Sequence, residues 1–86
     1  MPVIRLRQPL KRLAGELKEH EVEAATVVAA LAALEAANPG LRGWVLDERG
    51  HLRRHINAYL NGELAAPDDA VAAGDRIDVI PAISGG

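Results

Sequence analysis

Apolar and polar residues alternate near both ends of the chain, and this alternation predicts two strands. Within residues 2–7, isoleucine and leucine alternate with arginine, which is the period-two pattern of a strand with one buried face. Within residues 76–80, Ile77 and Val79 are expected to point inward and their neighbours outward. Pro81 would end this strand because proline has no backbone N–H to donate. These two strands are the most apolar, so we expect them to lie side by side at the centre of a sheet.

In the first half of the chain, the spacing of apolar residues predicts a helix from about Thr26 to Ala37, which is the clearest element of the sequence. Valine and leucine residues three and four positions apart fall on one face of this helix. The Thr26 hydroxyl is suited to cap the N-terminus, because it can accept from a free backbone N–H. Asn38-Pro39-Gly40 would end the helix.

Residues 10–25 are ambiguous, since leucine spacing alone would permit one long helix over residues 10–37. Gly15 and the β-branched run at 26–28 argue against such a helix. We therefore expect a short helix that begins at Pro9 and ends near Gly15, followed by a short strand somewhere in Lys18–Glu23. The alternation in that second strand is poor.

In the second half we expect a strand at 55–60, a type I′ hairpin turn at Asn61-Gly62 and a short returning strand at 63–65. Residues 47–50 are expected to form a turn, and Trp44 to fill the core beneath a loop. The resulting order of strand, strand, helix and further strands indicates an α+β fold: a mixed sheet of four or five strands packed on one main helix.

The composition excludes several classes of function but does not identify one. The 86 residues suffice for one domain, carry a formal net charge of −2, and include no cysteine, one Trp and one Tyr. Such a chain lacks the basic surface and the aromatic residues of nucleic-acid binders, and its sequence has neither a membrane-span pattern nor a signal-peptide layout. We therefore expect a cytoplasmic protein with no nucleic-acid or membrane partner.

Recognisable catalytic groups are also missing from the sequence. It has no Ser/His/Asp set and no glycine-rich phosphate loop, and we interpret His51 and His55 as surface residues rather than metal ligands. The run 51–55 is a local basic patch that is either plain surface or a docking site for an acidic partner. We expect a protein that is not itself an enzyme and that binds no cofactor or metal.

The C-terminal residues suggest chemistry performed on this chain by another protein. We expect residues 1–80 to form the folded domain and residues 81–86 a flexible tail ending in Gly85-Gly86. Six extended residues reach roughly 20 Å, at about 3.3–3.6 Å each, which is enough to enter a partner's active site. An ATP-dependent enzyme could adenylate the terminal carboxylate of Gly86, and a sulfur donor could then convert it to a thiocarboxylate. An amine could instead attack the activated carbonyl and give a conjugate.

Four segments, taken together and in order, resemble the MoaD/ThiS type of ubiquitin-like sulfur carrier. They cover nearly the whole chain: Leu13-Ala14-Gly15; Glu21-Val22 with Thr26-Val27; the strand and hairpin at 55–63 with its Asn57 and Asn61-Gly62; and the ending that runs from Gly74-Asp75 through Pro81 to Gly85-Gly86. The resemblance implies a ubiquitin-like β-grasp fold. The charged second strand departs from the family pattern.

The resemblance also implies the partners and the site. Gly86 would be adenylated and thiocarboxylated by an E1-like adenylating and sulfurtransferase enzyme that uses ATP, and would donate sulfur to a downstream synthase. The apolar open face of the sheet would dock partners. The residues expected to bind them are Tyr59 and the tail residues Pro81, Ala82, Ile83, Ser84 and Gly85.

Several functions remain open within and outside this family. Residues 46–54 are similar to carriers used for cysteine biosynthesis in actinobacteria, a group that also includes carriers for transfer-RNA thiolation. The small subunit of molybdopterin synthase, which serves molybdenum cofactor biosynthesis, has the same ending. A thiamine carrier is usually shorter. A protein modifier conjugated through Gly86 and a plain helical interaction domain are the remaining alternatives.

Overall fold

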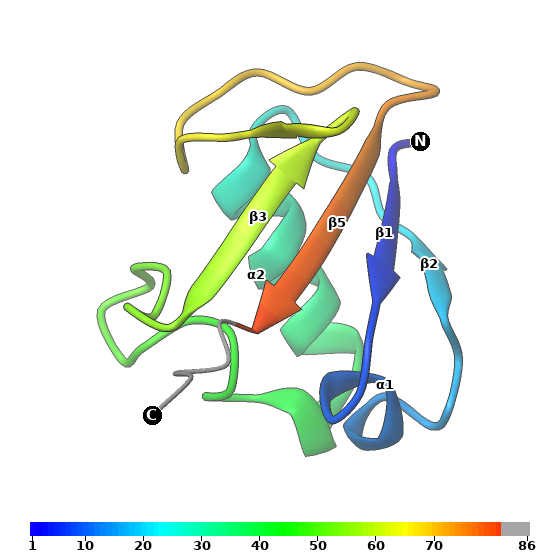
Figure 1. Cartoon of the computed structure of the whole chain (residues 1–86), viewed down its shortest axis with the longest axis vertical. Helices are drawn as coiled ribbons and strands as arrows, with labels where there is room; N and C mark the ends of the chain where they lie inside the picture. The colour runs from blue at the N-terminus through cyan, green and yellow to red at the C-terminus, as the bar shows by residue number, and fades with distance from the viewer. Residues whose placement is uncertain (82–86) are drawn as a thin grey trace.

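A computed structural model describes residues 1–81 and places one mixed sheet against one main helix (Figure 1). The elements in chain order are β1 (Val3–Leu6), α1 (Leu10–Leu13), β2 (Glu19–Glu21), α2 (Val27–Ala37), the 3-10 helix η1 (Pro39–Leu41), β3 (Ile56–Leu60), β4 (Glu63–Leu64) and β5 (Arg76–Pro81). This order confirms the predicted α+β class and excludes the single helix over residues 10–37. In the described residues, no helix has the length and apolar character needed to cross a membrane.

The strand order in the sheet is β2-β1-β5-β3-β4, so the last strand is the central one. β5 runs parallel to β1, with Ile4 opposite Ile77, and antiparallel to β3, with Ala58 opposite Val79. The first and last strands therefore lie side by side, as their apolar content predicted. Pro81 is the last residue of β5 and still pairs with Ile56, so the strand extends one residue beyond its predicted end.

The core lies between the sheet and α2, which crosses one face of it (Figure 1). The Thr26 hydroxyl caps α2 as predicted by accepting from the Ala29 backbone N–H at 3.2 Å. Burial of one apolar side chain contributes about 1.5–3 kcal/mol, and the following residues are almost fully buried: Ile4, Leu6, Leu10, Val27, Leu31, Leu34, Leu41, Val45, Ile77 and Val79.

Trp44 does not fill the core, and that prediction was wrong. Its side chain is 48% exposed, whereas Leu41, Val45 and Leu46 around it are buried. These three aliphatic residues fill the space beneath the loop, so the indole remains at the surface. Trp44 lines a surface hollow of about 280 Å³ with Arg53 and His55.

Glu35 is a buried carboxylate that joins α2 to this loop. Its side chain is 9% exposed, and its Oε2 accepts from the backbone N–H groups of Val45 and Leu46, both at 3.0 Å. A carboxylate is almost never buried without partners, and here it satisfies two buried backbone donors. Glu35 thereby fixes the irregular segment that connects η1 to the second half of the chain.

Candidate functional site

The candidate site is the end of β5, the last part of the described chain before the residues predicted to form the tail. β5 has a hydrogen-bonded strand on each side, and its ladder with β3 ends at the pair of Ile56 and Pro81. Pro81 is half-buried. The other predicted tail residues lie outside the described residues: Ala82, Ile83, Ser84, Gly85 and Gly86.

The start of β5 is held by the turn of the preceding hairpin. Asn61 and Gly62 have φ values of 51° and 90°, which fits the type I′ turn expected there. The Asn61 side chain donates from Nδ2 to Asp75 Oδ1 at 3.1 Å and accepts from the Arg76 backbone N–H at 2.9 Å. The Asn61 N–H in turn donates to the Arg76 carbonyl at 2.8 Å. The Asn-Gly and Gly-Asp motifs therefore meet in space.

Asp75 completes this junction. Its Oδ2 accepts from the Ala72 backbone N–H at 2.8 Å, closing the turn that leads into β5. That hydrogen bond, followed by the one from Asn61, lowers the pKa of the Asp75 carboxyl below its ordinary value of 3.8. Both bonds favour the charged form, so the junction is most stable when Asp75 is ionised.

Tyr59 lies on the open face of the sheet, away from α2. It is half-buried and sits opposite Asp78 on β5 and Leu64 on β4. Pro81 instead continues the inward alternation of Ile77 and Val79. The two predicted partner-binding residues that the structure describes therefore lie on different faces of the sheet.

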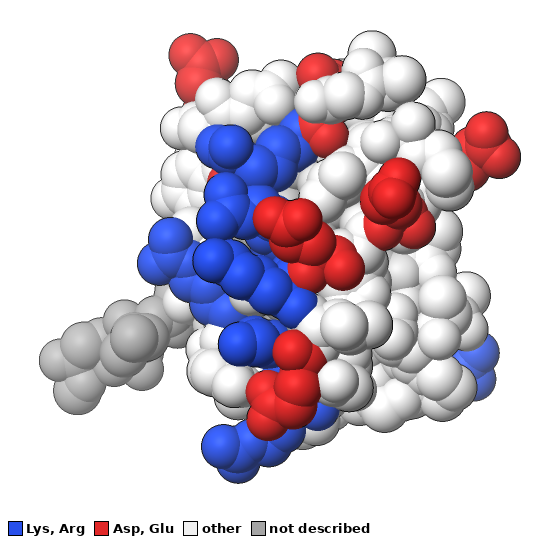
Figure 2. Space-filling view, turned by 90° about the vertical axis from the view of Figure 1, so that its right-hand side faces the viewer, with Lys and Arg blue, Asp and Glu red and all other residues white. Residues whose placement is uncertain are grey.

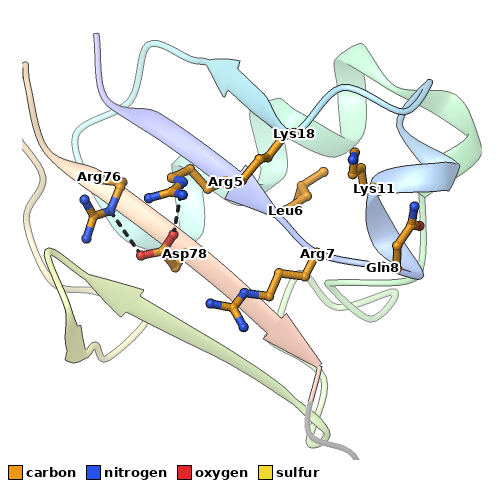
Figure 3. A pocket seen from close by; sticks show the side chains of 8 residues that line it. All are labelled: Arg5, Leu6, Arg7, Gln8, Lys11, Lys18, Arg76 and Asp78. Carbon is orange, nitrogen blue, oxygen red and sulfur yellow. Dashed lines mark hydrogen bonds and ion pairs between the residues drawn. The ribbon is translucent and has the colours of Figure 1, made fainter.

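The open face is mixed in character: Tyr59 and the exposed Leu64 lie on it at the β4 edge, whereas its part along β1 and β5 is charged. Figure 2 shows a stripe of Lys and Arg side chains along one side of the molecule, bordered by carboxylates. Part of this stripe lines a hollow of about 470 Å³ (Figure 3). We call it the basic hollow, and its lining consists of Arg5, Leu6, Arg7, Gln8, Lys11, Lys18, Arg76 and Asp78.

Asp78 is the acidic centre of the basic hollow. The Arg76 Nε lies 3.1 Å and the Arg5 Nε 3.8 Å from its carboxylate oxygens, and Arg5 also lies 3.7 Å from Glu19. The Arg5 Nε is buried yet has no hydrogen-bond partner in the described residues. Sequence reasoning missed this cluster because it forms only when β1 and β5 are paired. The only local indication of this cluster in the sequence was that the arginines at 5 and 7 occupy the outward positions of the first strand.

Comparison with known proteins identifies the family. The sequence matches the ThiS family over residues 4–86. The chain belongs to the ThiS family. It is 48% identical over 62 residues to small archaeal modifier protein 1 of Haloferax volcanii, covering 72% of this chain and 71% of that protein.

Solved structures agree with this assignment. The crystal structure of the same Haloferax volcanii protein has a TM-score of 0.88 at 40% identity, covering 99% of this chain and 98% of that one. CysO in the Amycolatopsis orientalis BexX/CysO complex has a TM-score of 0.87 at 27% identity, with both chains covered completely. The ubiquitin-like β-grasp fold implied by the resemblance is therefore confirmed for this ThiS-family chain.

Two other polar features of the sequence lie within the described residues: the histidines considered as metal ligands and the basic patch at 51–55. Between residues 1 and 81, no three His, Cys, Asp or Glu residues gather in a way that could hold a metal ion. Within the predicted basic patch at 51–55, the Arg53 Nε donates to the Gly43 carbonyl. The His51 backbone N–H donates to the Asp47 carboxylate at 3.0 Å, so part of this run is engaged in holding its own loop.

Proposed function

We propose that this chain is a sulfur carrier whose Gly86 carboxylate is activated by a separate E1-like enzyme and converted to a thiocarboxylate. The observation that carries the proposal is the ThiS-family match, which extends to Gly86 and so includes Gly85-Gly86. No group of the chain itself would catalyse the reaction. The chain would be a co-substrate, carrying sulfur covalently and holding no cofactor.

The chemistry requires two steps on the carrier. In the first, a Gly86 carboxylate oxygen attacks the α-phosphorus of ATP in the activating enzyme, which forms the acyl-adenylate and releases pyrophosphate. In the second, hydrosulfide attacks the acyl carbon, a C–S bond forms and AMP leaves. Glycine keeps this carbon unhindered because it has no Cβ. The thiocarboxylate then donates its sulfur within a downstream synthase.

The fold supplies a rigid base for such a tail. A strand hydrogen-bonded on both sides resists displacement more than an edge strand would, and β5 is also held at its start by Asn61 and Asp75. Because Pro81 still pairs with Ile56 at the end of β5, we assign residues 1–81 as the recognised domain and residues 82–86 as the reactive tail. Ala82 to Gly85 would contact the channel of the partner enzyme, and Tyr59 its surface.

Mass spectrometry of the intact chain tests this function. The purified chain is incubated with the E1-like enzyme of its source organism, ATP and sulfide, and we expect the exchange of one oxygen for sulfur, localised to Gly86 by fragmentation. A chain lacking Gly86 is the control and should remain unmodified. Unchanged mass of the full chain under these conditions would refute the carrier function. Cysteine biosynthesis and transfer-RNA thiolation are the routes to test downstream, on the resemblance of residues 46–54.

Conjugation to other proteins is a second candidate, favoured by the 48% identity to small archaeal modifier protein 1. In this reaction a lysine Nζ of a target attacks the activated Gly86 carbonyl and forms an amide. Blots of cell extract should then show species of higher mass that disappear in cells carrying the chain without Gly86. A single free band under several stresses would count against conjugation.

A further inference from the structure

Positive charge is concentrated in the basic hollow far beyond what the composition suggests. Among residues 1–81, its lining holds five of the ten Lys and Arg residues of the chain and one of its twelve Asp and Glu residues. The lining is therefore positive by four charges and the rest of the chain negative by six, which together give the net charge of −2. Clustered like charges repel one another, so the fold alone does not explain this arrangement.

Three of the cations have no acidic partner in the described part of the chain. Asp78 is shared by Arg5 and Arg76, whereas no described carboxylate lies within 4.0 Å of Arg7, Lys11 or Lys18. In Figure 3, these three side chains come from the end of β1, from α1 and from the segment before β2. They are well placed to pair with carboxylates of another molecule.

The hollow also adjoins the end of β5. Leu6 pairs with Val79, so Arg7, the next residue, lies alongside the last two residues of that strand. The five residues that follow Pro81 span at most roughly 18 Å, at about 3.3–3.6 Å each. Gly86 can therefore reach the catalytic centre of a partner seated in the hollow if that centre lies within this distance of the end of β5.

We propose that the basic hollow is the docking site for an acidic surface of the adenylating enzyme. This inference rests on the proposed function, because it assumes that such an enzyme is the partner. The Asp78 and Glu19 carboxylates within and beside the hollow favour a protein with mixed charges over a nucleic acid, whose phosphates they would repel. A chain with net negative charge also makes a poor general binder of nucleic acid.

Charge reversal at the three unpaired cations tests the docking site. The variant carries Arg7→Glu, Lys11→Glu and Lys18→Glu. Its matched control carries Arg42→Glu, Arg49→Glu and Arg54→Glu, an equal change of net charge at three exposed residues outside the hollow. Each is made in the full chain and in a chain lacking Gly86. Binding of the latter to the activating enzyme of the source organism is measured by calorimetry at low and physiological salt.

The hollow variant should bind at least about tenfold more weakly at low salt, because opposed charge patches govern association. Its Kd should also lose the salt dependence that the wild type shows. In the full chain, the KM for adenylation should rise by a similar factor with kcat within twofold, while the control matches the wild type. Equal losses in both variants, or no loss in the hollow variant, would overturn the docking site.

Two further measurements keep the test decisive. If circular dichroism shows that the triple variant does not fold, a double variant replaces it. This variant carries Arg7→Gln and Lys18→Gln, both at exposed positions, and its Kd for the activating enzyme should increase several-fold. Wild-type binding of labelled transfer RNA that is lost in the variant, while enzyme binding persists, would overturn the proposal in favour of a nucleic-acid site. Because binding is measured in the chain lacking Gly86, this result does not depend on thiocarboxylate formation. The docking site can therefore be confirmed even if the carrier function is refuted, and refuted even if the carrier function is confirmed.

Discussion

Replacing Glu35 by alanine should be among the most destabilising single substitutions in this chain. The Glu35 Oε2 accepts two buried backbone N–H groups, from Val45 and Leu46, both at 3.0 Å. Alanine removes the acceptor of both backbone donors. A hydrogen bond to a charged group contributes about 1.5–3 kcal/mol, so the two bonds are worth about 3–6 kcal/mol together.

Relief from burying a carboxylate offsets part of this sum, and we expect a net loss of about 3 kcal/mol. A domain of this size has a stability of about 5–15 kcal/mol. For a domain of 60–100 residues, each kcal/mol lowers the melting temperature by about 4–8 °C. The Glu35→Ala variant should therefore melt roughly 12–24 °C below the wild type, which circular dichroism and urea denaturation would both detect.

Two further variants separate hydrogen bonding from other effects. Glu35→Gln keeps an oxygen in the same place and loses only the charge, so we expect a cost of about 1 kcal/mol. Glu23→Ala removes an exposed glutamate and should change the free energy of unfolding by less than about 0.5 kcal/mol. A cost below about 1 kcal/mol for Glu35→Ala would refute the role assigned to this carboxylate.

Two other substitutions test contacts near the site and at the end of α1. Gly40→Ala would place a Cβ 2.8 Å from the Leu13 carbonyl oxygen, so we expect a loss of about 1–3 kcal/mol in urea denaturation; unchanged stability would contradict the close approach. The fold lowers the pKa of the Asp75 carboxyl, chiefly through the hydrogen bond from the Ala72 N–H and then through the one from Asn61. Ionised Asp75 therefore stabilises the fold above pH 3.8, the ordinary pKa. This contribution is lost as the pH falls through the lower pKa of the folded state. The difference in unfolding free energy between wild type and Asp75→Asn should therefore shrink as the pH is lowered, and a constant difference would refute the linkage.

Elements with local signals were predictable from the sequence. Alternation identified β1 and β5, the Thr26 cap placed the start of α2, and Asn61-Gly62 located the hairpin turn, because each depends on residues within a few positions of one another. The central position of β5 followed from its apolar content, since the inner strands of a sheet are buried most deeply.

Features that depend on distant residues were missed or wrong. Glu35 gave no local sign of burial, because its partners lie ten and eleven residues away. Trp44 was assigned to the core by its size, but Leu41 and Val45 occupy that space. The basic hollow required the register between β1 and β5, which no local pattern specifies. For the same reason, the sequence did not show that the open face is charged along β1 and β5.

The motifs that support the family assignment divide into two physical roles. Asn61 and Asp75 hold the start of β5 through hydrogen bonds within the described fold, so their substitution should lower stability and reduce sulfur transfer only as far as the domain unfolds. Gly86 is expected to act in chemistry alone, and its removal should abolish transfer without changing the melting temperature. A variant of Asn61 that folds fully yet cannot be adenylated would show that this division is wrong, and that the hairpin itself contacts the activating enzyme.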